Sequence, residues 1–153
     1  MHMNRTWIEA RIPHQGRMCL LDEVLDWDAH RIRCRTGTHR APDNPLRSHG
    51  RLGVACGIEY AAQTMALHGA LAGGSTLAAA GSASRVGLLA SVRDVRLLVL
   101  RLDDIEPDLI CEVSHIAGDS LTALYEFVLR EPGRPLLSGR ASVVLDADRR
   151  MSL

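Results

Sequence analysis

The sequence predicts an α+β fold in which one long buried helix is wrapped by an antiparallel sheet of about six strands. Two observations support this prediction. Residues 51–72 would be apolar around most of the circumference of a helix, and the segments on both sides alternate between apolar and polar residues. A helix without a polar face is a buried helix. In a chain of 153 residues, the strands are the elements that remain to cover it.

The composition is that of an ordinary globular domain. Hydrophobic residues make up 46% of the chain and charged residues 24%, which argues against disorder and fits a single domain over residues 1–153. The 18 basic residues, all of them arginine, balance 18 acidic residues, and this zero net charge argues against a nucleic-acid-binding protein. Because there is no apolar run of transmembrane length and no recognisable signal peptide, we expect a cytoplasmic protein that does not insert into membranes.

The four cysteines are scattered among apolar neighbours. Cys19, Cys34, Cys56 and Cys111 form no C-x-x-C pair, and no histidine lies at zinc-ligand spacing from them. We therefore expect buried thiols that act as small hydrophobic side chains, and no structural metal.

The first half of the chain predicts a hairpin followed by a polar loop. Residues 20–27 form one strand, the pair at 28–29 forms the turn, and residues 30–36 form the returning strand. Residues 39–50 contain two prolines, an asparagine and a glycine, which are typical of a loop.

The long helix is predicted over residues 51–72, where alanine, leucine, methionine, glutamine and glutamate favour helix formation. Its apolar residues form two stripes that together leave no polar face. The small residues of 73–85 predict a loop within the domain.

After this loop the hydrophobic period changes to two, which predicts strands. Residues 86–102 are long enough for one bent strand, and alternating patterns continue over residues 109–116, 121–130 and 137–145. Turn signals separate the last three segments, so we expect a four-strand antiparallel meander. A central helix enclosed by such a sheet is the hotdog architecture.

Glu59 is the first candidate for chemistry, because it lies inside the predicted buried helix. Small or uncharged side chains surround it, and no arginine lies three or four residues away to neutralise it. Desolvation should then raise its pKa, which is the property that a general acid needs near neutral pH. The structural alternative is a glutamate that bonds to a neighbouring strand or reaches solvent near the start of the helix.

His14 is the second candidate. Pro13 fixes the backbone beside it, and Gly16 permits a tight approach just before the first strand. A single histidine is often structural or exposed, but one on a stiffened turn is a good candidate for a general base. His49, just before the helix, is the reserve candidate, and we expect His68, in mid-helix, to be packed or capped.

Four segments resemble the hotdog 3-hydroxyacyl-[acyl-carrier-protein] dehydratases of type II fatty-acid synthesis. Residues 12–24 (IPHQGRMCLLDEV) resemble their opening segment, and residues 57–63 (GIEYAAQ) resemble their helix motif, in which glutamine follows an acidic residue by four positions. Residues 88–96 and 139–141 match two later strands. The likeness covers roughly residues 10–146 and is closest to the dehydratases of aryl-polyene biosynthesis.

The resemblance implies a catalytic His14 and a catalytic Glu59, contributed by opposite subunits of a homodimer or of a heterodimer with a related dehydratase. It implies no metal and no organic cofactor. The expected substrate is a 3-hydroxyacyl thioester on the phosphopantetheine of an acyl carrier protein. Dehydration to the trans-2-enoyl thioester would use neutral His14 to remove the C2 proton and Glu59 to protonate the departing C3 hydroxyl.

The start of the helix departs from the family pattern. The family's G-H-F-P segment is absent, residues 48–52 read SHGRL, and Val54 occupies the position of an expected glycine. Backbone N–H groups at the start of a helix can still hold an oxyanion. We therefore expect the N–H groups of Val54 or Ala55 to hold the thioester oxygen, and we count Gln63 among the substrate-binding residues.

Two alternatives remain open from the sequence. A hotdog thioesterase would use a helix carboxylate to activate water and would not require His14, and a dehydratase-like scaffold subunit would have no activity. A surface cluster of arginines would suit an acidic carrier protein, and we expect Arg93, Arg96 and Arg101 to be its candidates, although each is also compatible with an ordinary solvated face.

Overall fold

The computed structural model describes residues 2–79 and 88–145 and contains one long helix and a six-stranded sheet. The helices are α1 (Arg5–Glu9) and α2 (Gly57–Ala79), with short 3-10 turns at Gly16–Met18, Thr38–Arg40 and Val54–Cys56. The strands are β1 (Glu23–Trp27), β2 (Arg31–Thr36), β3 (Leu88–Leu97), β4 (Leu109–Gly118), β5 (Thr122–Glu131) and β6 (Arg134–Val144).

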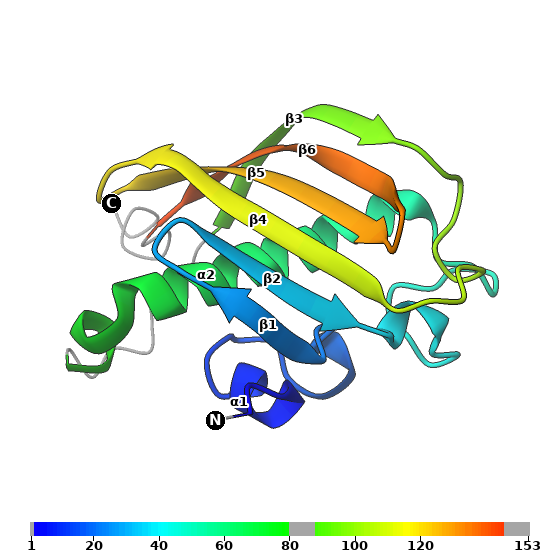
Figure 1. Ribbon diagram of the computed structural model, residues 1–153, viewed down its shortest axis with the longest axis horizontal. Helices are drawn as coiled ribbons and strands as arrows, with labels where there is room; N and C mark the ends of the chain where they lie inside the picture. Colours follow the sequence, from blue (N-terminus) through cyan, green and yellow to red (C-terminus); the bar gives the residue numbers. More distant parts are fainter. Residues whose placement is uncertain (1, 80–87, 146–153) are drawn as a thin grey trace.

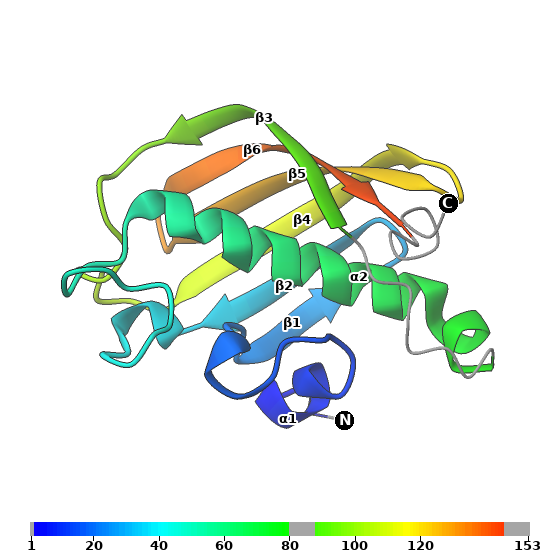
Figure 2. The ribbon, with the colours of Figure 1, turned by 180° about the vertical axis from the view of Figure 1, so that it is seen from behind.

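The sheet is antiparallel in the order β1-β2-β4-β5-β6-β3 and curves around α2. Figure 1 shows the sheet in front of the helix, and Figure 2 shows α2 crossing the concave side of the same sheet. Alternate residues of β4 and β5 are buried against α2, as a period of two requires for a strand with one covered face. The predicted hotdog architecture is confirmed.

The predicted connectivity of the last four strands is wrong in one respect. Only β4, β5 and β6 form a meander, whereas β3 crosses over and pairs with β6 at the edge of the sheet. Residues 98–102, predicted as part of β3, instead lead from β6 to the segment just before the long helix: Leu98 N–H donates to Leu136 O, and Leu102 N–H donates to Leu52 O. Helix α1 has only five residues and was not predicted from the sequence.

The long helix extends further than predicted. The sequence places its end at residue 72, but α2 continues through residue 79, and the remainder of the predicted loop, residues 80–85, lies outside the described residues. The core contains Cys19, Cys34 and Cys111, while Cys56 is half-buried, and all four thiols are free. Their predicted role as small buried side chains is thus confirmed for three of the four.

His68 ties the middle of α2 to two parts of the sheet. Its Nε2–H donates to Asp28 O (3.0 Å), so its Nδ1 accepts from the hydroxyl of Tyr125 (2.9 Å). Burial lowers the pKa of His68 and raises the pKa of Tyr125 to about 12, and both side chains are therefore neutral near pH 7. His68 is packed, as predicted. In the described part of the chain, no helix is long and apolar enough to cross a membrane.

Candidate active site

His14 and Glu59 meet within one chain. His14 lies in the segment between α1 and the 3-10 turn at Gly16–Met18, and Glu59 lies in the first turn of α2. The distance from His14 Nε2 to Glu59 Oε1 is 3.3 Å, and the side chains are 27% and 37% exposed, respectively. The pair is therefore close enough to exchange a proton and open enough to meet a substrate.

Gln63 lies one helical turn after Glu59 and is completely buried. Its Nε2–H₂ group donates to Met18 O (2.7 Å) and to Glu59 Oε1 (3.2 Å), and its Oε1 accepts from Leu20 N–H (2.9 Å). These bonds account for both ends of the amide, so Gln63 connects the segment that carries His14 to the helix that carries Glu59. This geometry makes Gln63 a positioning residue, and the expectation that it contacts substrate finds no support.

The expected rise in the pKa of Glu59 is wrong. Burial does raise this pKa, but the hydrogen bond with His14 is the larger effect, and together with the bond from Gln63 it lowers the pKa below the ordinary value. Glu59 is therefore a carboxylate near neutral pH. The sequence did not predict this direction, because both groups that stabilise the charge are positioned by folding.

The hydrogen bonds distinguish the two carboxylate oxygens of Glu59. Oε1 accepts from both His14 and Gln63, whereas Oε2 makes no hydrogen bond to any described residue. Since a carboxylate only accepts, His14 presents Nε2–H to it. His14 Nδ1 is buried and has no hydrogen-bond partner within residues 2–79 and 88–145, so neutral His14 carries its proton on Nε2.

The structure distinguishes between Val54 and Ala55, the two residues whose N–H groups are expected to hold the thioester oxygen. The Val54 N–H already donates to Leu100 O (3.2 Å), so Val54 is not a free donor, and that expectation is corrected. Ala55 is exposed in the same turn and precedes Glu59 by four residues. Ala55 is the candidate that remains.

The reserve histidine does not join the site. His49 lies at the exposed tip of a tight turn, where its Nδ1 contacts Ser48 Oγ at 3.0 Å. Its positive φ of 53° and that of Gly50, 73°, are the backbone values of a type I′ turn. The structure thus gives His49 a place in a surface turn, while His14 is the histidine that contacts Glu59.

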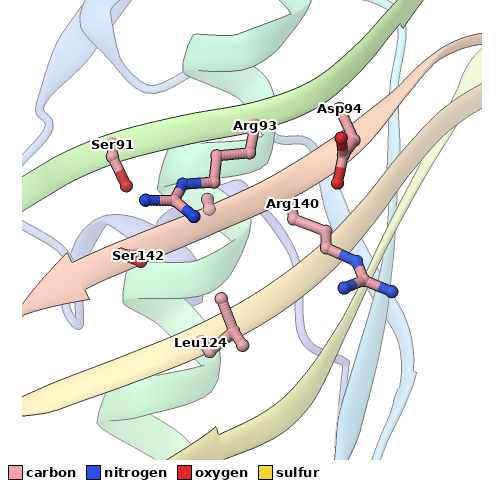
Figure 3. Close-up of a pocket in the computed structure, with 7 residues that line it drawn as sticks. Ser91, Arg93, Asp94, Leu124, Arg140 and Ser142 are labelled. Carbon is pink, nitrogen blue, oxygen red and sulfur yellow. The ribbon is translucent and has the colours of Figure 1, made fainter.

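A shallow hollow of about 150 Å³ lies over β3, β6 and β5, on the face of the sheet that points away from α2. Ser91, Arg93 and Arg140 are among its lining residues, and Figure 3 shows the two guanidinium groups pointing away from each other with α2 behind the strands. Arg140 also pairs with Glu126 (3.2 Å). The hollow is therefore separate from the His14–Glu59 pair and lacks converging charges.

Sequence reasoning missed the main-chain groups that complete the site. The Met18 carbonyl and the Leu20 peptide hold Gln63, but no side-chain pattern shows where a carbonyl will point. Within residues 2–79 and 88–145, no group of three or more His, Cys, Asp and Glu side chains is arranged to hold a metal ion.

Comparisons with known proteins give a family for the chain. The family model described as ApeP-like, ApeP dehydratase, matches residues 6–152. No curated protein matches the chain.

Solved structures with the same fold include both dehydratases and thioesterases. A chain of the dehydratase heterocomplex ApeI:P from Xenorhabdus doucetiae has a TM-score of 0.77 and 19% identity, with 94% of this chain and 93% of that chain covered. A mutant thioesterase from Pseudomonas aeruginosa has a TM-score of 0.62 and 12% identity, with 93% of both chains covered. A thioesterase family protein from Silicibacter pomeroyi has a TM-score of 0.61 and 11% identity, with 90% and 94% covered. At these identities the likeness shows the shared fold.

The expectation that His14 and Glu59 come from opposite subunits is wrong, because one chain brings them to 3.3 Å. We therefore predict no complementation between a His14→Ala chain and a Glu59→Gln chain. In a mixed dimer every site still lacks one of the two groups. After co-refolding, with mixed dimers verified by mass, turnover should stay at the average of the two variants. Recovery toward a quarter of the wild-type rate would show a site shared between subunits.

Proposed function

The chain belongs to the ApeP-like dehydratase family, and from this premise we propose that it dehydrates a 3-hydroxyacyl thioester to the trans-2-enoyl thioester. The observation that carries the proposal is the His14–Glu59 contact, with one carboxylate oxygen held and the other free. The thioester is proposed to arrive on the phosphopantetheine of an acyl carrier protein, in fatty-acid or aryl-polyene-type biosynthesis. The reaction uses no organic cofactor and no metal.

Glu59 is the base in the proposed reaction. Its lowered pKa keeps it ionised, and Oε2 is the oxygen that no described residue occupies. Oε2 takes the proton from C2, and the electron pair of the C–H bond passes to the thioester as an enolate. The N–H of Ala55, an exposed residue in the turn just before the long helix, is the proposed donor to the enolate oxygen.

The same proton completes the reaction. Protonated Glu59 donates it to the C3 hydroxyl, the C3–O bond breaks, the C2–C3 double bond forms and water leaves. Glu59 returns to the carboxylate, so protons and electrons balance within the site. His14 keeps its Nε2–H on Oε1 throughout and steadies the carboxylate. This role differs from the base role that the sequence predicted for His14, because the nitrogen that faces Glu59 carries a proton.

The proposed docking of an acidic carrier protein rests on exposed arginines. Arg93 and Arg96 lie on the exposed strand β3 and make no ion pair with any described residue. Arg101 differs, because it pairs with Asp103. Of the three arginines predicted for this role, Arg93 and Arg96 therefore remain candidates.

Two glutamine variants separate the roles of the pair. Glu59→Gln should lower turnover by a factor on the order of 10²–10⁴, because an amide accepts no proton. His14→Gln keeps an N–H donor near the place of Nε2, so turnover should fall by about tenfold or less. Steady-state kinetics on a 3-hydroxyacyl thioester, with folding checked by circular dichroism, measures both. If His14→Gln falls as far as Glu59→Gln, His14 is the base, as the sequence predicted.

The products of the same assay test the function itself. An ionised Glu59 with a free oxygen is also suited to activate water against a thioester, so a thioesterase is the second candidate. Formation of the enoyl thioester supports the dehydratase. Release of free thiol without enoyl product supports the thioesterase, and the absence of both products supports a scaffold subunit.

The open edge of the sheet supports a dimer, with a second copy or a related dehydratase subunit. At the β1 edge, Asn4 forms a bridge with Glu23, and Val24 N–H donates to Met3 O (2.9 Å). On the side of β3 that faces away from β6, no strand among the described residues pairs with it. Leu97, at the end of β3, is 53% exposed, and Leu100, three residues beyond that end, is 91% exposed. An unpaired strand edge with exposed leucines at its end can pair with a strand of another chain. We place the interface at β3.

Charged substitutions at this edge should separate the subunits. Leu97→Asp combined with Leu100→Asp should give the mass of one chain by light scattering at micromolar concentration, whereas the wild type gives the mass of two. The matched control is Leu25→Asp combined with Trp27→Asp, on exposed side chains of β1, and it should remain dimeric. A monomeric wild type contradicts self-pairing. An unchanged mass in the β3 variant contradicts the location of the interface.

A further inference from the structure

The backbone N–H and the backbone carbonyl of Leu20 are both hydrogen-bonded to side chains in the protein interior. The N–H donates to Gln63 Oε1 (2.9 Å), and the carbonyl accepts from the hydroxyls of Thr38 (2.7 Å) and Thr36. Leu20 is 1% exposed, and Thr36 is completely buried. This peptide lies six residues after His14, so its position limits where the His14 segment can lie.

A chain of hydrogen bonds leads from the Leu20 carbonyl to Tyr60. The Tyr60 hydroxyl lies 2.8 Å from Thr38 Oγ1 and accepts from Asn44 Nδ2 at 3.0 Å. Because Asn44 Nδ2 only donates, the single phenol proton is free to go to Thr38, whose own proton goes to the Leu20 carbonyl. These bonds join Tyr60 through Thr38 to the Leu20 carbonyl, and the Thr38 hydroxyl also lies 2.9 Å from that of Thr36.

Tyr60 holds this place as a neutral phenol. Its side chain is 0% exposed, and desolvation raises its pKa, so it keeps its proton at any pH of interest. Asn44 is also fixed, because the same Nδ2 donates to Thr38 O (2.9 Å) while Oδ1 accepts from Leu46 N–H (2.9 Å). Buried polar groups that are all paired leave few alternative arrangements.

We propose that Tyr60 is a positioning residue for the His14–Glu59 pair, acting through Thr38 and the Leu20 peptide. Tyr60 directly follows Glu59 on α2, and Gln63 follows one turn later. The helix is thus connected to the Leu20 carbonyl by the hydrogen bonds of Tyr60 and Thr38, and to the Leu20 N–H by the hydrogen bond of Gln63. The proposal rests on the proposed function only for its kinetic consequence, because the hydrogen bonds that connect Tyr60 and Gln63 to Leu20 exist without substrate.

Removal of one hydroxyl tests the proposal. Tyr60→Phe keeps the buried ring but breaks the chain at the phenol. We expect kcat to fall by a factor on the order of 10 to 100 with KM changed less than about twofold, because a small displacement of a reacting group costs rate more than binding. The carboxyl titration of Glu59, followed by carbon-13 NMR, should move to a higher midpoint in the same variant, because the contact with His14 that lowers this pKa weakens.

Tyr125→Phe is the matched control. Tyr125 is also buried (4% exposed), and Tyr125→Phe loses the hydrogen bond to His68 (2.9 Å), whereas Tyr60→Phe loses those to Thr38 and Asn44. A general loss of stability therefore affects both variants. The control should keep the wild-type kcat and the wild-type Glu59 titration. The proposal is overturned if Tyr60→Phe lowers the melting temperature like the control and leaves both other measurements unchanged.

Thr38→Val supplies a second route to the same result. It removes the hydroxyl between Tyr60 and Leu20 and should reproduce the kinetic and NMR changes of Tyr60→Phe. The double variant should be no worse than either single one, because both interrupt one chain; additive losses overturn the proposal. If the wild type lacks dehydratase activity, the proposed function fails, and the Glu59 titration in the three single variants still decides the role of Tyr60.

Discussion

The buried amide of Gln63 is the interaction on which the rest of the site depends. A buried amide must pair both its oxygen and its nitrogen, and Gln63 does so with Leu20 N–H, Met18 O and Glu59 Oε1. A flipped amide would face the Leu20 N–H donor with its nitrogen and two acceptors with its oxygen, so one orientation is strongly preferred. That orientation gives Glu59 a second donor beside His14 and leaves Oε2 for the substrate.

The fixed orientation of the Gln63 amide contributes to the reason why Glu59, although half-buried, is ionised. Burial alone would favour its neutral form, but two N–H donors aimed at one oxygen outweigh this effect. The same donors also keep Oε1 occupied, and only one face of the carboxylate is left for chemistry. A single site can thus remove a proton from one carbon and return it to a leaving oxygen, provided that the His14 segment stays in position.

Local patterns predicted the elements well and their partners poorly. The long apolar helix and the alternating strands follow from hydrophobic periodicity, which depends on neighbouring residues. The pairing of β3 with β6 depends on tertiary contacts, which a local pattern does not contain. The continuation of α2 to Ala79 runs through small residues, two of them glycines, whose local propensity for helix is weak. Likewise, residue types identified His14 and Glu59, but the lowered pKa, the within-chain contact and the Tyr60–Thr38 chain all join segments distant in the sequence.

The carboxyl titration of Glu59 tests the central claim most directly. Carbon-13 NMR of the selectively labelled carboxyl group, in the protein without substrate, gives its midpoint. The account predicts a midpoint below the ordinary 4.5, because His14 and Gln63 donate to Oε1, and a higher midpoint in His14→Ala, which loses one donor. A wild-type midpoint above 4.5 that His14→Ala leaves unchanged would show that burial dominates and that His14 does not hold Glu59.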